Sequence, residues 1–161
     1  MFKRKILSKL EAWKRDERHK PLILRGARQV GKTTVVNEFG SQFDNYLYFN
    51  LEMNESVRLF EMDIPLNDLV NMLFASSGKS QREGSTLIFI DEIQNSPKTI
   101  ALLRYFYEQR PDLYVIAAGS LLENLVDVNV SFPVGRVMYM ALRPCSFYEF
   151  LGAIGKTNLL A

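Results

Sequence analysis

The sequence of 161 residues contains one cysteine, Cys145, and one histidine, His19. A single cysteine excludes an internal disulfide and fits a reducing compartment, so we expect a cytoplasmic protein. The scarcity of both residue types also argues against a structural zinc site, which takes four such ligands. No apolar run approaches the roughly 18 residues of a membrane-spanning helix, and the basic first segment lacks the apolar core of a signal peptide. We therefore expect no membrane association.

Composition indicates a globular domain, with 47% apolar and 24% charged residues. The net charge is only +2, but the basic residues gather at the start of the chain, where residues 1–20 hold eight basic and three acidic side chains. Such a segment could contact a nucleic-acid backbone or an acidic protein partner. The alternative is that these charges form the solvated face of a helix.

Residues 2–16 have the pattern of an amphipathic helix, because Phe2, Ile6, Leu10 and Trp13 fall on one stripe at helical spacing. We therefore predict an N-terminal amphipathic helix within residues 1–20, ending before Pro21.

Five short apolar runs follow this segment, and most are apolar on both faces, which is typical of buried parallel strands. They are Leu22–Leu24, Tyr46–Leu51, Thr86–Ile90, Leu113–Ala118 and Val137–Leu142. Helical patterns lie between them at Lys32–Phe39, Leu66–Phe74 and Pro97–Glu108. Strands that alternate with helices predict an α/β fold with a parallel sheet.

The end of the chain opens with Ser146 and Glu149 in capping-box spacing, which predicts a helix over Phe147–Leu151. Residues 152–161 have no obvious end signal, and we interpret them as the start of a truncated lid or linker. The polar stretch Ser76–Ser85 predicts an exposed loop.

Residues 26–33 form the pattern G-x-x-x-x-G-K-T, between a predicted strand and a predicted helix. Glycines let the backbone wrap closely around phosphates, and the amide N–H groups and helix dipole then attract the anion. Lys32 supplies a cation for the β and γ phosphates, and Thr33 offers a hydroxyl ligand to Mg²⁺. We predict that ATP is held by one continuous segment: Gly26, Ala27, Arg28, Gln29, Val30, Gly31, Lys32, Thr33 and Thr34.

The second half of the site is the apolar run Leu87–Ile90 followed by Asp91 and Glu92. An aspartate at the end of a strand can hold Mg²⁺ directly or through water, so Asp91 joins Thr33 as a predicted metal residue. Glu92 is the candidate general base for an attacking water. An Asp-Glu pair is a weak signal alone and becomes a strong one about 60 residues after a P-loop.

The sequence resembles the AAA and related ATPases, in which a catalytic glutamate follows the magnesium aspartate. More narrowly, it resembles bacterial and archaeal ATPases of uncharacterised role that carry an extra C-terminal domain. The resemblance covers about residues 20–151. The segments that carry it are Arg25–Thr33, Asp91–Gln94, Gly119–Ser120, Pro133–Arg136 and Leu142–Leu151.

This resemblance implies a three-layer αβα P-loop domain over residues 21–151, with a parallel five-stranded sheet in the order 5-1-4-3-2. It implies that Glu92 polarises water and that Ser120 is a polar sensor after the fourth strand. It makes Arg136 a candidate for phosphate contact, in the same subunit or across the interface of a homo-oligomer. Two alternatives stay open, since Ser120 and Glu123 have capping-box spacing and Arg136 could be an ordinary surface arginine.

Several nearby residues have no assigned role. Arg28 could face phosphate or solvent, and Arg25 could pair with an acid. Gln94 could position water, contact a partner or cap a turn, and the role of Glu52 is open. The aromatic residues of the second strand, including Tyr48, are interpreted as core.

The sequence contains no Asn-Lys-x-Asp string for guanine, so we expect ATP with Mg²⁺ rather than GTP. Three functions compete. The first is an ATPase that drives a conformational change in an attached domain or in a protein or nucleic-acid partner. The second is a nucleotide-binding switch with little turnover. The third is a small-molecule kinase, for which the single arginine of the polar loop, Arg82, is thin support.

Overall fold

The computed structural model describes residues 4–81, 84–120, 133–156 and 158. Its centre is a five-stranded sheet in the order β2-β3-β4-β1-β5, and every pair of neighbouring strands is parallel. The strands are β1 (Leu22–Arg25), β2 (Asn45–Asn50), β3 (Thr86–Asp91), β4 (Tyr114–Gly119) and β5 (Met138–Ala141). This is the predicted order 5-1-4-3-2 counted from the other edge, so the α/β P-loop fold is confirmed.

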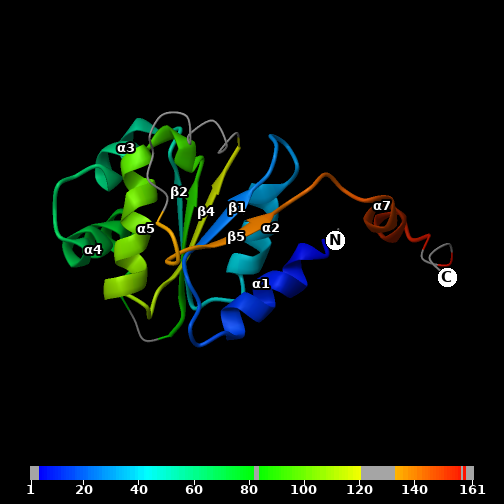
Figure 1. Ribbon diagram of the computed structural model, residues 1–161, viewed down its shortest axis with the longest axis horizontal. Coiled ribbons are helices and arrows are strands. Elements are labelled where there is room, and N and C mark those ends of the chain that lie inside the picture. Colours follow the sequence, from blue (N-terminus) through cyan, green and yellow to red (C-terminus); the bar gives the residue numbers. More distant parts are fainter. Residues whose placement is uncertain (1–3, 82–83, 121–132, 157, 159–161) are drawn as a thin grey trace.

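Helices cover both faces of the sheet, which gives the three predicted layers (Figure 1). One face carries α1 (Ile6–Arg15) and α2 (Lys32–Gly40), and the other carries α3 (Asn54–Phe60), α4 (Leu66–Ser76) and α5 (Pro97–Gln109). Each face has its own apolar core cluster. The two clusters differ because side chains of one buried strand alternate between faces.

The basic N-terminal segment is part of this domain rather than a separate unit. Ile6, Leu10 and Trp13 are buried and belong to the core cluster of α2. The first three residues, including Phe2, lie outside the described residues. The charged side chains of α1 are exposed or half-buried, as a solvated helix face requires, but Arg4, which precedes the helix, is only 7% exposed.

Two elements were not predicted from the sequence. Helix α3 buries only Phe60, so it has almost no apolar periodicity to detect. The 3-10 turn η1 (Ile93–Asn95) follows Glu92, and it is too short for a periodic pattern.

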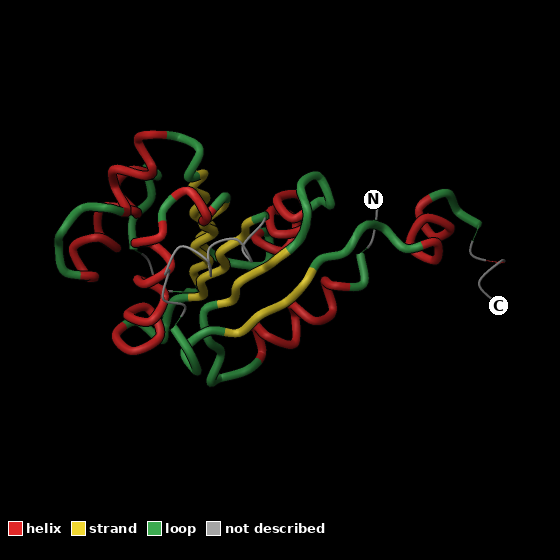
Figure 2. The backbone as a smooth tube through the Cα atoms, turned by 45° about the horizontal axis from the view of Figure 1, so that its top comes forward, coloured by secondary structure: helices red, strands yellow, loops and turns green. Residues whose placement is uncertain are grey.

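The last described elements are the edge strand β5 and helix α7 (Phe147–Ala153). Figure 2 shows α1 alongside β5, with α7 beyond the end of that strand. The predicted capping box is present, because Ser146 Oγ accepts from Glu149 N at 3.2 Å and Glu149 Oε2 accepts from Ser146 N at 2.8 Å. The outward face of α7 exposes Phe147, Tyr148 and Phe150.

The parallel register brings the ends of distant segments to one edge of the sheet. Arg25 at the end of β1 pairs with Gly119 on β4, and Asp91 at the end of β3 pairs with Asn50 on β2. The loop after β1 and the acids after β3 therefore meet at the carboxyl edge, where open α/β sheets bind ligands. Among the described helices, none is long and apolar enough to cross a membrane.

Candidate functional site

The glycine-containing loop between β1 and α2 has the backbone that its sequence requires. Gly31 precedes the first residue of α2 and has φ +94°, a left-handed conformation that side chains rarely adopt. Gln29 has φ +62°, which is uncommon for a residue with a side chain and often marks a functional loop. A Cβ on Gly26 would lie 2.5 Å from the carbonyl oxygen of Leu142. Gly26 is thus required by close packing against the chain after β5.

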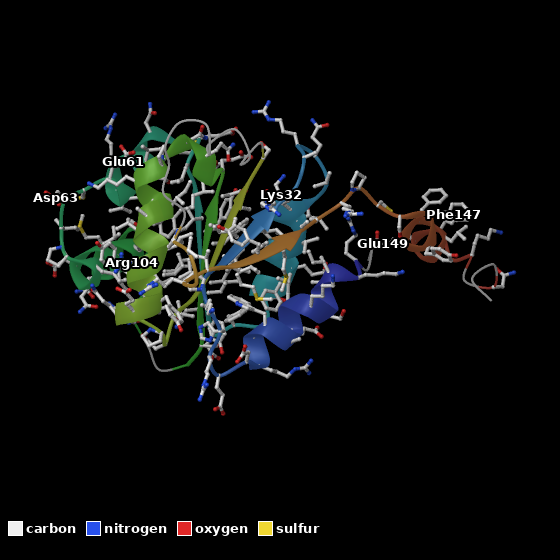
Figure 3. The ribbon with its side chains drawn as sticks, viewed as in Figure 1. Lys32, Glu61, Asp63, Arg104, Phe147 and Glu149 are labelled. Atoms are coloured by element: carbon white, nitrogen blue, oxygen red, sulfur yellow. The ribbon has the colours of Figure 1, made fainter. Side chains whose placement is uncertain are left out.

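Lys32 lies at the start of α2, inside the curve of this loop (Figure 3). Its Nζ donates to the carbonyl oxygens of Gly26 at 2.7 Å and Ala27 at 2.6 Å. Burial lowers the pKa of the Lys32 ammonium, while the nearby carboxylates of Glu92 and Asp91 act in the opposite direction. The loop therefore holds an ammonium group close to two acids at the edge of the sheet.

Asp91 is the buried carboxylate of the site, with 3% of its surface exposed. Its Oδ2 accepts from Thr33 Oγ1 at 2.6 Å and from the Tyr48 hydroxyl at 3.0 Å, and its Oδ1 accepts from Glu92 N at 3.0 Å. The two predicted metal residues, Thr33 and Asp91, are thus in direct contact.

Tyr48 is a site residue that the sequence analysis missed. Its predicted place in the core is wrong, because the side chain is 40% exposed and its hydroxyl reaches Asp91. Burial raises the pKa of Tyr48, and the Asp91 carboxylate raises it further, so the phenol keeps its proton and stays a donor. The available signal was the alternation of β2, where Tyr46 and Tyr48 share one face of the strand and Phe49 points to the other.

Glu92 follows Asp91 and has a left-handed backbone, with φ +56° and ψ 45°. This conformation turns the chain sharply out of β3 and into η1. Gln94 Nε2 donates to Glu92 Oε2 at 2.6 Å. The Gln94 Oε1 is buried, and among the described residues it has no hydrogen-bond partner. One amide group therefore holds the candidate base.

A hollow of about 580 Å³ lies between the loop, Glu92 and Glu52. Its lining is polar and comes from the loop, α2, the turn after β2 and the residue after β3: Arg28, Gln29, Gly31, Lys32, Thr33, Thr34, Glu52 and Glu92. Of the predicted loop residues, Gly26 and Ala27 contribute carbonyls to Lys32, and Val30 is buried with its carbonyl directed at Arg4. Glu52, whose role the sequence analysis left open, thus lines the site.

The oxygen atoms of this site suit Mg²⁺ better than a transition metal. Thr33 and Asp91 supply a hydroxyl and a carboxylate, the hard ligands that Mg²⁺ accepts while keeping waters and phosphate oxygens. Within the described ranges, no group of three or more His, Cys, Asp or Glu side chains could enclose a metal ion by itself. The residues fit a metal that arrives with its nucleotide.

Ser120 and Arg136, two further predicted site residues, lie at opposite edges of the sheet. Ser120 is buried directly after β4, at the same sheet edge as the loop, and its proposed capping partner Glu123 is outside the described residues. Arg136 stands two residues before β5, whose Met138 is level with Leu22 at the start of β1. Within this chain Arg136 is therefore at the opposite edge from the loop. Its Nε donates to Glu108 Oε1 at 2.9 Å, and this hydrogen bond is the main reason why the pKa of Glu108 is lowered.

Arg25 and Arg28 are both exposed near the loop. The Arg25 guanidinium lies 5.4 Å from the centre of the Tyr139 ring on β5. This cation–π contact takes the place of the acidic partner that the sequence suggested. Arg28 lines the hollow and is the loop side chain with a positive charge beside Lys32.

Comparison with known proteins identifies the family and the fold of the chain. A family model described as an AAA domain matches residues 18–151. A search of curated proteins found no match. Among solved structures, the Walker-type ATPase PABY2304 of Pyrococcus abyssi superposes with a TM-score of 0.62 at 18% identity, over 99% of this chain and 59% of that one. A structure of Drosophila ORC bound to DNA superposes with a TM-score of 0.60 at 14% identity, over 95% of this chain and 46% of that one. The chain thus spans about half the length of these proteins, and at such identities the likeness shows the fold.

Proposed function

Since the chain belongs to the AAA domain family of P-loop ATPases, we propose that it binds ATP together with Mg²⁺ and hydrolyses the bond to the terminal phosphate. The observation that carries the proposal is the contact between Thr33 Oγ1 and Asp91 Oδ2, at 2.6 Å, beside Lys32 and Glu92. The Thr33 hydroxyl, the Lys32 ammonium and the Glu92 carboxylate line one hollow, and the buried Asp91 carboxylate is hydrogen-bonded to Thr33. This is the set of groups that Mg-ATP hydrolysis needs.

The loop residues of this chain would hold the phosphates. The N–H groups at the start of α2 and the helix dipole favour an anion at this position. Lys32 would exchange its bonds to the Gly26 and Ala27 carbonyls for phosphate oxygens, without a large movement of its buried stem. Thr33 and Asp91 would hold Mg²⁺, which supplies charge neutralisation for the β and γ phosphates when bound.

Glu92 would act as the general base. It orients a water molecule and takes one of its protons, while the water oxygen forms a bond to the γ-phosphorus and the bond to the β–γ bridging oxygen breaks. Its half-buried position and left-handed backbone keep the carboxylate at the edge of the hollow. Ser120, after β4, would contact the γ-phosphate or the water as a polar sensor.

Turnover would drive a conformational change in an attached domain or partner. Helix α7 lies away from the three layers after β5. Exposed Lys5, just before α1, and Lys9 on α1 offer positive charge to an acidic or nucleic-acid partner. The ORC structure contains DNA bound to ORC, so DNA is one partner to test for this chain. Arg136 would reach phosphate only across an interface between subunits.

A binding switch with little turnover is the second candidate. The contact between Gln94 and Glu92 favours it, because a base held at 2.6 Å by an amide is less free to take a proton. The kinase alternative rested on Arg82, which lies outside the described residues. We rank it third, because the acids at the sheet edge suit water activation.

The test is to measure ATP binding and phosphate release for the wild type and for Glu92→Gln. We expect the variant to keep its ATP affinity within about twofold and to lose phosphate release by about a hundredfold or more. Glu52→Gln is the matched control, since Glu52 lines the same hollow and should change release far less. Equal release by Glu92→Gln and the wild type would refute the role of Glu92. Tight binding by a wild type that releases no phosphate would favour the switch.

A further inference from the structure

Arg4 is a buried arginine two residues before the start of α1, and it joins segments that are far apart in the sequence. Its Nη1 donates to the carbonyl of Val30 at 3.0 Å, and its Nη2 donates to the carbonyl of Arg143 at 2.6 Å. Its Nε donates to Glu149 Oε1 at 3.3 Å, as part of an ion pair. One guanidinium therefore connects the phosphate loop, the segment after β5 and the first turn of α7.

The contact with Val30 fixes the orientation of a peptide group in the loop. The peptide bonds of the described residues are all trans, so a C=O and the following N–H point in opposite directions. Because the Val30 carbonyl faces Arg4, the Gly31 N–H faces the other way, toward the hollow that Gly31 lines. A Cβ on Gly31 would lie 3.4 Å from Arg4 Nη1, which shows how closely the guanidinium packs against the outside of the loop.

Glu149 holds Arg4 in this position. Its Oε1 also accepts from Lys5 N at 3.0 Å, and its Oε2 accepts from Ser146 N in the capping box of α7. The side chains of Arg4 and Glu149 are 8% and 10% exposed. A charge pair so largely shielded from solvent depends on both members, because removing one leaves the other charge without a partner. Figure 3 shows Glu149 beside the amino end of α1, at the base of α7.

We propose that Arg4 is a positioning residue for phosphate binding, and that Glu149 makes this function depend on the attachment of α7. Arg4 directs the Gly31 N–H into the phosphate site, and Glu149 keeps Arg4 in place only while the first turn of α7 is docked. The inference rests on the nucleotide binding of the proposed function and does not require hydrolysis. Coupling of this kind is reciprocal, so bound ATP stabilises the docking of α7 by the same factor.

The experiment uses the full chain and three variants. Arg4→Lys keeps the charge and loses the fork of donors, Glu149→Gln removes the opposite charge, and the third variant combines both. Affinity for Mg-ATP and for inorganic triphosphate is measured by calorimetry well below each unfolding temperature. We expect Arg4→Lys to weaken both affinities by about tenfold, the effect of one charge-assisted hydrogen bond. The double variant should lose less than the product of the single losses, because both changes act on one contact.

Two readouts separate positioning from a merely structural role. In ¹⁵N-labelled protein, triphosphate should move the Gly31 amide signal of the wild type and move it less in Arg4→Lys. The amide of Phe150 donates to Ser146 O at 2.9 Å in α7. Bound ATP should slow the hydrogen exchange of this amide in the wild type and not in Arg4→Lys. Arg15→Lys, at the exposed end of α1, is the matched control and should leave all these values unchanged.

A folded Arg4→Lys variant whose ATP and triphosphate affinities stay within twofold of the wild type would overturn the inference. The inference would also be overturned if the loss of affinity in the double variant equalled the product of the two single losses. Arg15→Lys changes as large as those of Arg4→Lys would overturn it too. A wild type that binds ATP without releasing phosphate would contradict the proposed hydrolysis alone. A wild type that binds neither ATP nor triphosphate would contradict both.

Discussion

The hydroxyl of Thr33 lies 2.6 Å from Asp91 Oδ2, although the two residues are 58 positions apart in the sequence. Thr33 is the second residue of α2, and Asp91 is the last residue of β3. Their contact exists because β1 and β3 flank β4 in one parallel sheet, so the segments that follow these two strands leave the sheet at the same edge. A helix start and a strand end thus combine into one site for Mg²⁺ and phosphate.

Tyr48→Phe tests the hydrogen bond that the sequence analysis missed. The phenol donates to Asp91 Oδ2 at 3.0 Å from a half-exposed position. Its loss should weaken Mg²⁺-dependent ATP affinity by about twofold to tenfold, the effect of one hydrogen bond of about 0.5–1.5 kcal/mol. ATP affinity without Mg²⁺ should change less. Titrations with and without the metal check this, and equal losses in both would show that Tyr48 does not act through Asp91. Tyr105→Phe, on an exposed face of α5, is the control.

Gly26→Ala tests the close packing of the loop against the chain after β5. The new Cβ would meet the Leu142 carbonyl oxygen at 2.5 Å, and this neighbour is backbone that cannot move aside cheaply. We expect a loss of about 1–3 kcal/mol in the free energy of unfolding, typical of overpacking. Denaturant titration measures it. Gly152→Ala is the control, since nothing lies within 4 Å of a Cβ there. A loss of the same size in both variants would remove the steric explanation.

The pH dependence of stability follows from Glu149. Burial raises the pKa of its carboxyl, but hydrogen bonds from the Ser146 and Lys5 backbone, together with the charge of Arg4, lower it by more, so the net pKa lies below the ordinary 4.5. A carboxyl with a lowered folded-state pKa adds stability above its unfolded pKa, and this stability disappears as pH falls through the folded pKa. Wild type should therefore be more stable than Glu149→Gln near neutral pH, and the difference should shrink below about pH 4.5. Denaturant unfolding curves for both proteins from neutral pH to below about pH 4.5 measure this difference. A difference in the free energy of unfolding that does not change with pH would contradict this role of the Glu149 carboxylate.

The parts of the fold that were predictable depend on local patterns. The runs that became β1 to β5 are apolar on both faces or nearly so, and the order of the sheet followed from the resemblance to P-loop ATPases. Lys32 and Thr33, whose spacing the loop motif fixes, lie near Asp91 and Glu92 in the structure.

The parts that were not predictable depend on tertiary contacts. Arg4 looked like one more charge on a solvated helix, because nothing in the first segment shows that Val30, Arg143 and Glu149 surround it. Tyr48 looked like core because it lies in an apolar run, and only the position of β2 beside β3 brings its hydroxyl to Asp91. Arg136 was linked to phosphate by resemblance, whereas its contact in this chain is with Glu108.

The most direct test of the central claim is a calorimetric titration of the wild type with ATP, with and without Mg²⁺, and with GTP as the competing nucleotide. The matched variant is Lys32→Ala, which removes the ammonium inside the loop. The account predicts Mg²⁺-dependent binding of ATP, weaker binding of GTP, and a loss of about a hundredfold or more in ATP affinity for Lys32→Ala, as expected when a buried charge contact worth about 3 kcal/mol is removed. An ATP affinity that changes neither when Mg²⁺ is removed nor in Lys32→Ala would contradict the claim.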